Sequence, residues 1–200
     1  MIGTPTGPFN PDAKAVYYEA QSKIGYVHRQ KFAAPLAAAA ATIHALVNSA
    51  LVITTGITQP DMARVLSIVS GGSGHNAAGV VVINGTDYRG NTIADTITLN
   101  GNTTVNGIKA FASVTSIDMT GVTGNDANNT VSVGISKILG LHRILQGDEV
   151  LCVTVDGVWE TTRPTVVSNT TDISQNTLSP NTAPNAAKNF TASYITTEIF

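Results

Sequence analysis

The chain has 200 residues and a formal net charge of −2, and 12% of its residues are charged, about half the fraction usual for soluble domains. Thr (27), Asn (16) and Gly (18) are abundant instead. This composition excludes a coiled coil, which needs Glu, Lys and Leu, and it disfavours disorder, because disordered chains are charged and poor in β-branched residues. We expect no nucleic-acid partner, since the net charge is negative and no basic patch is present.

Residues 1–49 differ from the rest of the chain. Five of the eleven aromatic residues lie in the first 32 residues, which carry a net charge of +2, whereas the remainder carries −4. An aromatic, mildly basic segment on an acidic body is typical of an arm that docks onto a partner. We therefore predict an arm (1–49) and a body (50–200). The side chains predicted to contact the partner are Phe9, Tyr17, Tyr18, Tyr26 and Phe32. The alternative is an arm that folds back onto its own body.

The local structure of the arm has two interpretations. Apolar residues within 13–24 fall on one helical face, but the tyrosines also suit an extended segment. The alanine run 37–41 has a high helix propensity, yet small residues also suit a strand that lies close to another surface. The arm is accordingly predicted to be extended or partly helical.

From about residue 50 the hydrophobic period changes to two, which predicts about nine strands separated by turns. In chain order they are 50–55, 64–69, 79–83, 92–99, 110–117, 130–133, 150–155, 165–168 and 192–196. In 92–99, Ile93, Ile97 and Leu99 share one face and threonines the other. Residues 84–91 are predicted to form a tight hairpin connection. Spacings of this kind predict an all-β fold with a β-sandwich or barrel body.

Motifs that would carry chemistry are weak. The glycine-rich segment 72–77 precedes a predicted strand, whereas a dinucleotide-binding loop needs a helix there. The four histidines have no paired spacing and Cys152 is the single cysteine, so neither a zinc motif nor an intrachain disulfide is expected. Asp87 and the segment 125–129 offer carboxylate and amide oxygens, but we predict surface turns there rather than calcium-binding loops. We expect no cofactor, no metal, no catalytic residues and no enzymatic activity, although a metal site assembled across the fold or on an oligomer axis stays open.

Trp159 follows an Asp-Gly turn. We expect it to pack in the core or to cover a sheet edge rather than to act as a partner contact. The sequence shows no signal peptide at its start and no apolar stretch long enough to span a bilayer, so no membrane partner is expected.

Five stretches resemble virion structural proteins of tailed bacteriophages. They are 53–61, 79–101, 105–117, 130–141 and 156–160, and the resemblance is one of composition and turn pattern rather than of a catalytic signature.

The resemblance covers about residues 50–200 and implies a β-rich, non-enzymatic subunit of the phage particle. The first expectation is a capsid decoration (cement) protein, or the base of a head fibre, on the capsid exterior. Its partners would be the major capsid protein and further copies of itself, as a homo-oligomer and most plausibly a trimer. The alternatives are a tail-tube, neck or fibre subunit and, as a separate class, a carbohydrate-binding domain.

Overall fold

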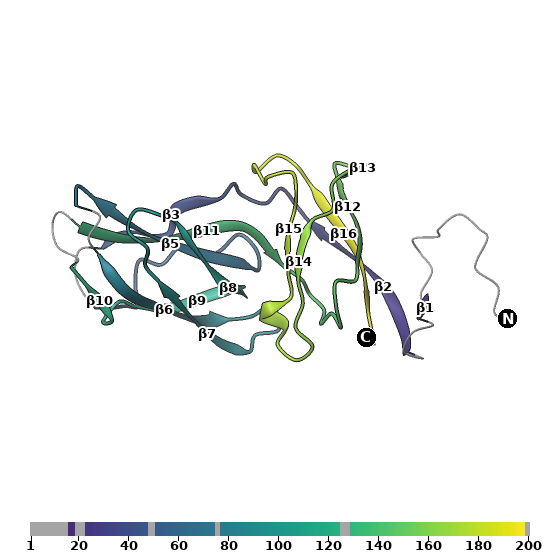
Figure 1. Ribbon diagram of the computed structural model, residues 1–200, viewed down its shortest axis with the longest axis horizontal. Coiled ribbons are helices and arrows are strands. Elements are labelled where there is room, and N and C mark those ends of the chain that lie inside the picture. The colour runs from purple at the N-terminus through teal and green to yellow at the C-terminus, as the bar shows by residue number, and fades with distance from the viewer. Residues whose placement is uncertain (1–15, 19–22, 48–50, 75–76, 125–128, 199–200) are drawn as a thin grey trace.

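The computed structural model of the chain describes residues 16–18, 23–47, 51–74, 77–124 and 129–198, and within them it is almost entirely β-structure (Figure 1). This confirms the predicted all-β class. The described helical structure is a single 3₁₀ turn, η1 (Ile173–Gln175), in which Ser174 N donates to the capping Asp172 side chain. No helix in this part of the chain is long and apolar enough to cross a membrane.

Sixteen strands are described, and they form three sheets. The β16 sheet has the order β1-β2-β16-β12-β13, with β1 Val16–Tyr18, β2 Lys23–Phe32, β12 Val150–Val155, β13 Val158–Trp159 and β16 Phe190–Thr196. The β6 sheet has the order β10-β6-β9-β4 with β7 on β6, and its strands are β4 Val52–Ile53, β6 Ala78–Thr86, β7 Thr92–Thr98, β9 Ser113–Asp118 and β10 Val122–Thr123. The β11 sheet has the order β14-β15-β11-β5-β8 with β3 on β11, and its strands are β3 Ala39–Val47, β5 Arg64–Gly72, β8 Val105–Phe111, β11 Asn129–Gly140, β14 Thr165–Val167 and β15 Thr177–Ser179.

Two hydrophobic cores lie along the length of the molecule. The β6 and β11 sheets enclose the first, in which Ile83, Ile117, Leu66 and Ile68 are inaccessible to solvent. The β16 sheet encloses the second with the end of β11 and with β15. The twelve-residue strand β11 contributes to both, with residues 131–135 in the first core and Leu139 in the second. Burial of each large aliphatic side chain contributes about 1.5–3 kcal/mol, so the two cores are the main source of stability.

Alternation along β7 follows the predicted pattern. Ile93 and Ile97 are buried, whereas Thr92, Thr96 and Thr98 are exposed. Asp95 also lies on the buried face, where its carboxylate accepts hydrogen bonds from the backbone N–H groups of Ile108 (2.8 Å) and Lys109 (3.1 Å). These bonds join the β6 sheet to the β11 sheet, because β7 and β8 belong to different sheets.

The predicted strand 110–117 is wrong in one respect, because the chain changes sheets within it. β8 pairs with β5, whereas β9 pairs with β6. At the crossing, Ala112 N donates to Thr86 O (2.8 Å) and Phe111 is fully buried. One short stretch therefore serves two strands that face one core from opposite sheets.

Residues 23–47, in the predicted arm, form β2 and β3, which pair with strands from distant parts of the chain. β2 runs antiparallel to β16 from Tyr26↔Thr196 to Phe32↔Phe190, and β3 runs antiparallel to β11. The alanine run forms a strand rather than a helix because β3 approaches β11 closely. A Cβ on Gly134 would lie 1.9 Å from Ala39 O, so the close approach of the β3 backbone requires glycine at position 134.

A buried arginine holds the connection between β2 and β3. No part of the Arg64 side chain is exposed; its Nη1 lies 2.7 Å from Asp61 Oδ1, and its Nη2 donates to Leu36 O (3.1 Å). Leu36 N in turn donates to Asp61 Oδ2 (2.8 Å). Arg64 Nε donates to Ser136 O (3.0 Å), at the point where the register between β5 and β11 shifts. The pair Arg64–Asp61 therefore fixes both polar groups of Leu36 and the irregular part of β11.

Replacement of Arg64 by Met should destabilise the protein by about 3–5 kcal/mol, because it leaves buried carbonyl groups and the Asp61 carboxylate without their donor. Equilibrium urea unfolding of the full chain measures the change. The control is Arg163→Met, which removes an exposed ion pair with Asp148 and should cost less than about 1 kcal/mol. An Arg64→Met protein as stable as this control would contradict the role assigned to Arg64.

Candidate functional site

The five aromatic residues predicted to contact a partner are distributed over several positions. Phe9 lies outside the described residues. Tyr17 and Tyr18 are on β1, where the backbone pairs with Ile24 and Lys23 of β2. Tyr26 is half-buried at the start of the pairing between β2 and β16.

Phe32 is the one of the five that the structure places in a core. It is 3% exposed, packs in the second core and lies opposite Phe190 in the sheet. Residues 26–32 therefore fold back on the chain's own body. Contact of the tyrosines with a partner stays a prediction.

A polar pocket of about 300 Å³ lies where the two cores meet. The hairpin between β6 and β7, strand β8, the segment before β12 and the η1 turn contribute its walls. Its lining residues are Asp87, Arg89, Asn91, Thr92, Ile93, Lys109, Ile144, Thr171, Asp172 and Ile173.

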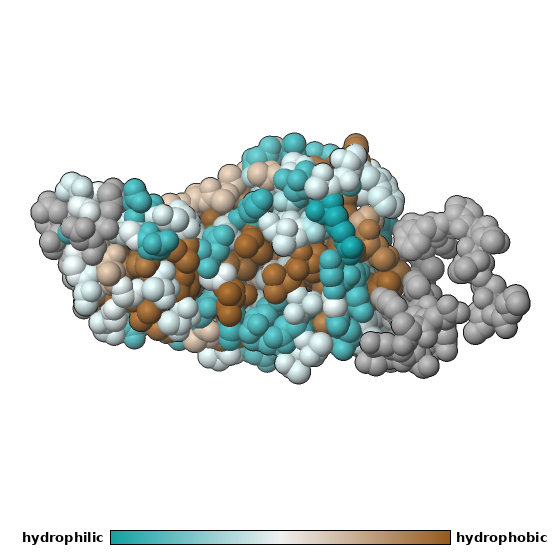
Figure 2. Space-filling view, in the orientation of Figure 1, coloured by the Kyte–Doolittle hydropathy of each residue, from teal (hydrophilic) through white to brown (hydrophobic). Residues whose placement is uncertain are grey.

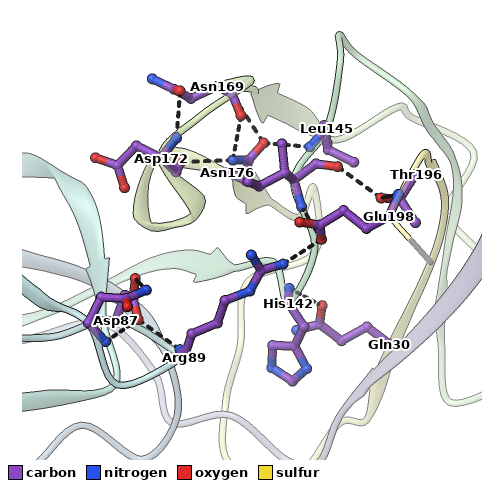
Figure 3. Close-up of polar contacts among 12 residues, drawn as sticks. Gln30, Asp87, Arg89, His142, Leu145, Asn169, Asp172, Asn176, Thr196 and Glu198 are labelled. Carbon is purple, nitrogen blue, oxygen red and sulfur yellow. Dashed lines mark hydrogen bonds and ion pairs between the residues drawn. The ribbon is translucent and has the colours of Figure 1, made fainter. Parts of the chain in front are cut away.

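Charged groups at this pocket are already paired. Arg89 extends from the hairpin to Glu198, with Nη2 2.5 Å from Oε2 (Figure 3). The same carboxylate oxygen accepts from Ile144 N (3.0 Å). On the other side, Lys109 Nζ lies 3.5 Å from Asp172 Oδ2. Both ion pairs join parts of the chain that are distant in sequence.

Asp87 forms hydrogen bonds within its own turn. Its carboxylate accepts from Arg89 N (2.7 Å), Asn91 N (3.0 Å) and Asn91 Nδ2 (2.9 Å), and Gly90 has a positive φ of 82°. The predicted tight connection is therefore present, but it spans residues 87–91 rather than 84–91, because residues 84–86 belong to β6. The three hydrogen bonds to this carboxylate hold the conformation of the turn.

Asn176 organises the segment before β15. Its Oδ1 accepts from Leu145 N (3.0 Å) and Asn169 N (3.1 Å), and its Nδ2 donates to Asn169 O (2.8 Å) and Asp172 O (2.9 Å) (Figure 3). The side chain is fully buried, and these four bonds use both of its polar atoms. Asn176 thus holds the η1 turn, and with it Asp172, against the chain near Leu145.

The electrostatics of the pocket favour the charged carboxylates. Burial is the largest single influence on Glu198 and works to raise its pKa. The hydrogen bonds from Arg89 and Ile144 N and the positive charges of Arg89 and Arg143 together outweigh burial, so the pKa of Glu198 is lowered. Burial also works to raise the pKa of Asp172. The hydrogen bonds from Ser174, the positive charge of Lys109 and the hydrogen bond from Gln175 together outweigh burial, so the pKa of Asp172 is lowered.

An imidazole lies beside this network. His142 stacks on Tyr88 with ring centroids 3.4 Å apart, and its backbone N–H donates to Gln30 Oε1 (2.9 Å). Burial, and then the positive charges of His28 and Arg143, lower the pKa of His142 from 6.5 to about 4. Burial and Arg143 also lower the pKa of His28. The neutral imidazoles are therefore the forms that suit the folded protein.

Within the described residues no three His, Cys, Asp or Glu side chains gather as a metal site would require. The groups at the pocket bind one another, and the arrangement holds the two cores together.

Large apolar side chains are exposed on the β12–β13 hairpin. Trp159 is 64% exposed and Val158 71%, and Leu151, at a bulge in β12, is also exposed. We call these three residues the hairpin surface. Figure 2 shows apolar residues reaching the surface at this end of the molecule. Trp159 lies opposite Thr154, on the other face of the sheet from Val155, which packs against the second core. Of the two expected roles of Trp159, packing in the core is wrong, because the side chain is exposed on β13, at the edge of the sheet, and points away from the core.

Comparison with protein-family models, with curated proteins and with solved structures gives no match for this chain.

Sequence reasoning did not identify Arg64, Arg89, His142 or Glu198 as joining groups. Arg64 starts an otherwise apolar strand, and a charge in such a run is a signal of a buried ion pair. His142 and Glu198 have no local signal, because their partners are distant in the sequence.

His142→Phe should reduce the loss of stability between pH 7 and pH 5. The unfolded chain takes up a proton as the pH falls below 6.5, whereas the folded chain does so only near pH 4, so the stabilisation present above pH 6.5 is lost as the pH falls towards 4. Phe keeps an aromatic ring on Tyr88 but cannot titrate. Urea unfolding at pH 7, 6 and 5 measures the effect, and an unchanged pH dependence in the variant would show that His142 does not cause it.

Proposed function

We propose that this chain is a non-enzymatic structural protein of a tailed-bacteriophage particle that decorates the outside of the capsid as a cement protein. Its partner is the major capsid protein, and it acts as a homo-oligomer, a trimer in which three copies present the same surfaces to the shell.

The hairpin surface is the observation that carries the proposal. Trp159 and Val158 are neighbours on β13 and point to opposite faces of the sheet, so this edge exposes large apolar side chains on both faces. Exposed apolar groups of this size are energetically unfavourable in water and indicate a contact surface. Trp is also among the residues that contribute most to protein–protein binding. The low fraction of charged residues acts in the same direction, because few charges have to be desolvated when the surface is covered.

The β-sandwich body suits a subunit that must be rigid, since residues far apart in the chain are joined by sheets and buried polar bonds. The resemblance of residues 79–101 and 105–117 to tailed-phage virion proteins suggests the particle. In a trimer, individually weak contacts add up, because once one copy is bound the others act at a high effective concentration.

A carbohydrate-binding domain is the second candidate, since an exposed Trp can stack on a sugar ring. The nearby Glu160 carboxylate would have to orient the sugar, but it already accepts from Asn181 N (3.3 Å) and Thr182 N (2.5 Å). This favours a protein partner for Trp159.

The double variant Trp159→Ser and Val158→Thr should bind phage heads that lack this protein at least about 30-fold more weakly, as expected when a central Trp is removed from an interface. Co-sedimentation with purified heads measures binding, and native mass spectrometry checks that the trimer is intact.

The matched control is Ile108→Thr, which changes a side chain that is 62% exposed on β8, in a different sheet. It should bind like the unchanged protein. Equal binding by the double variant and the control would exclude the hairpin surface, and failure of the unchanged protein to bind heads would contradict the proposed function. Glycan binding that depends on Trp159 would favour the second candidate.

A further inference from the structure

Strand β2 has a long edge without a partner strand among the described residues. On one side it pairs with β16 in unbroken register over residues 26–32. On the other side β1 covers only residues 23–25. The backbone groups of 26–32 that point away from β16 therefore lie along an open edge of the β16 sheet.

Two cations lie along this edge. Gln30 and Phe32 are buried on the inner face of β2, and Arg29 and Lys31 alternate with them, exposed on the outer face. Neither Arg29 nor Lys31 forms an ion pair within the described part of the chain. Residues two apart on a strand are about 6.7 Å apart, so the edge presents two like charges at that spacing.

We infer that the open edge of β2 accepts an extended, acidic strand from a partner protein. The partner strand adds to the sheet through main-chain hydrogen bonds, and carboxylates at alternate positions lie beside Arg29 and Lys31 on the outer face. This deepens the proposed function, on which it rests for the identity of the partner, by giving the chemistry of the segment that the shell contributes.

A second copy of this chain is a poor occupant of the edge. Antiparallel pairing of two β2 edges places residues 27–31 of one copy along the same residues of the other. Arg29 and Lys31 of both copies would then gather on one face, and like charges opposite one another destabilise a sheet pair. Lys and Arg on an edge discourage such self-association, and the same charges attract a carboxylate-bearing strand.

The cations also allow a simpler role, in which they only protect the edge. The two roles differ in one respect: a protected edge binds no strand, whereas an accepting edge binds an acidic strand and rejects a basic one.

The test uses the full chain and two labelled octapeptides, one alternating Thr with Glu and one alternating Thr with Lys. Fluorescence anisotropy should show binding of the Glu peptide that weakens as NaCl is raised, and at least about tenfold weaker binding of the Lys peptide. R29E/K31E should reverse this preference. Lys137→Glu, which changes an exposed cation on β11, is the matched control and should leave it unchanged.

N-methylation identifies strand addition. A strand added to one edge uses every second N–H of its backbone, so methylating one alternate set in the Glu peptide should abolish binding and methylating the other set should not. Equal effects of the two sets, or a Glu peptide that binds R29E/K31E unchanged, would overturn the inference. No binding of the Glu peptide at 1 mM would also overturn it and would leave the cations as edge protection. Head binding by the unchanged protein is measured separately, so the proposed function can survive this failure.

Discussion

The buried guanidinium of Arg64 is the interaction on which the arrangement of the molecule depends. It joins Asp61, Leu36 O and Ser136 O, and so connects the turn before β5, the link from β2 to β3 and the irregular part of β11. A charge removed from water is costly, and it is tolerated here because each guanidinium nitrogen has an acceptor. The hydrogen bonds of the Arg64 guanidinium therefore fix the path of the chain between the two cores.

Gln30 on β2 is a second buried polar side chain that joins distant segments. Its Nε2 donates to Gly140 O (3.0 Å), and its Oε1 accepts from His142 N and from Tyr194 OH, each at 2.9 Å. The amide thus ties β2 and β16 to the end of β11. With Arg64 it fixes the β16 sheet against the sandwich, which determines where the outer face of that sheet lies.

Trp159, from the hairpin surface, and the cations of β2 share this outer face. The register pairs Trp159 with Thr154, Thr154 with Thr191, and Thr191 with Lys31, so Trp159 and Lys31 lie at the two ends of one row across four strands. With strands about 4.8 Å apart the row spans about 14 Å, which one partner subunit can cover. A single partner subunit could therefore place an acidic strand along β2 and an apolar pocket over Trp159.

The sequence allowed the body strands with clear alternation to be predicted well. The predicted strand 150–155 has the bounds of β12, and Ile93 and Ile97 occupy the buried face of β7 as expected. The tight turn at Asp87 also had a local cause, because short polar side chains bond their own backbone.

Prediction was weakest where distant residues decide the outcome. The alanines of β3 form a strand because Gly134 of β11 allows close approach, and no local pattern encodes that contact. No Gly, Pro or Asn marks the sheet change at Ala112, and Trp159 is exposed although its residue type favours burial. The pocket residues Arg89 and Glu198 meet across 109 positions of sequence, so their pairing could not be foreseen.

Cryo-electron microscopy of the intact phage particle that carries this chain tests the central claim most directly. The account predicts clusters of three copies over the outer surface of the capsid, with the outer face of the β16 sheet, from Lys31 to Trp159, against the major capsid protein. Copies confined to the tail or neck, or a shell contact made through another face with Trp159 in solvent, would contradict it.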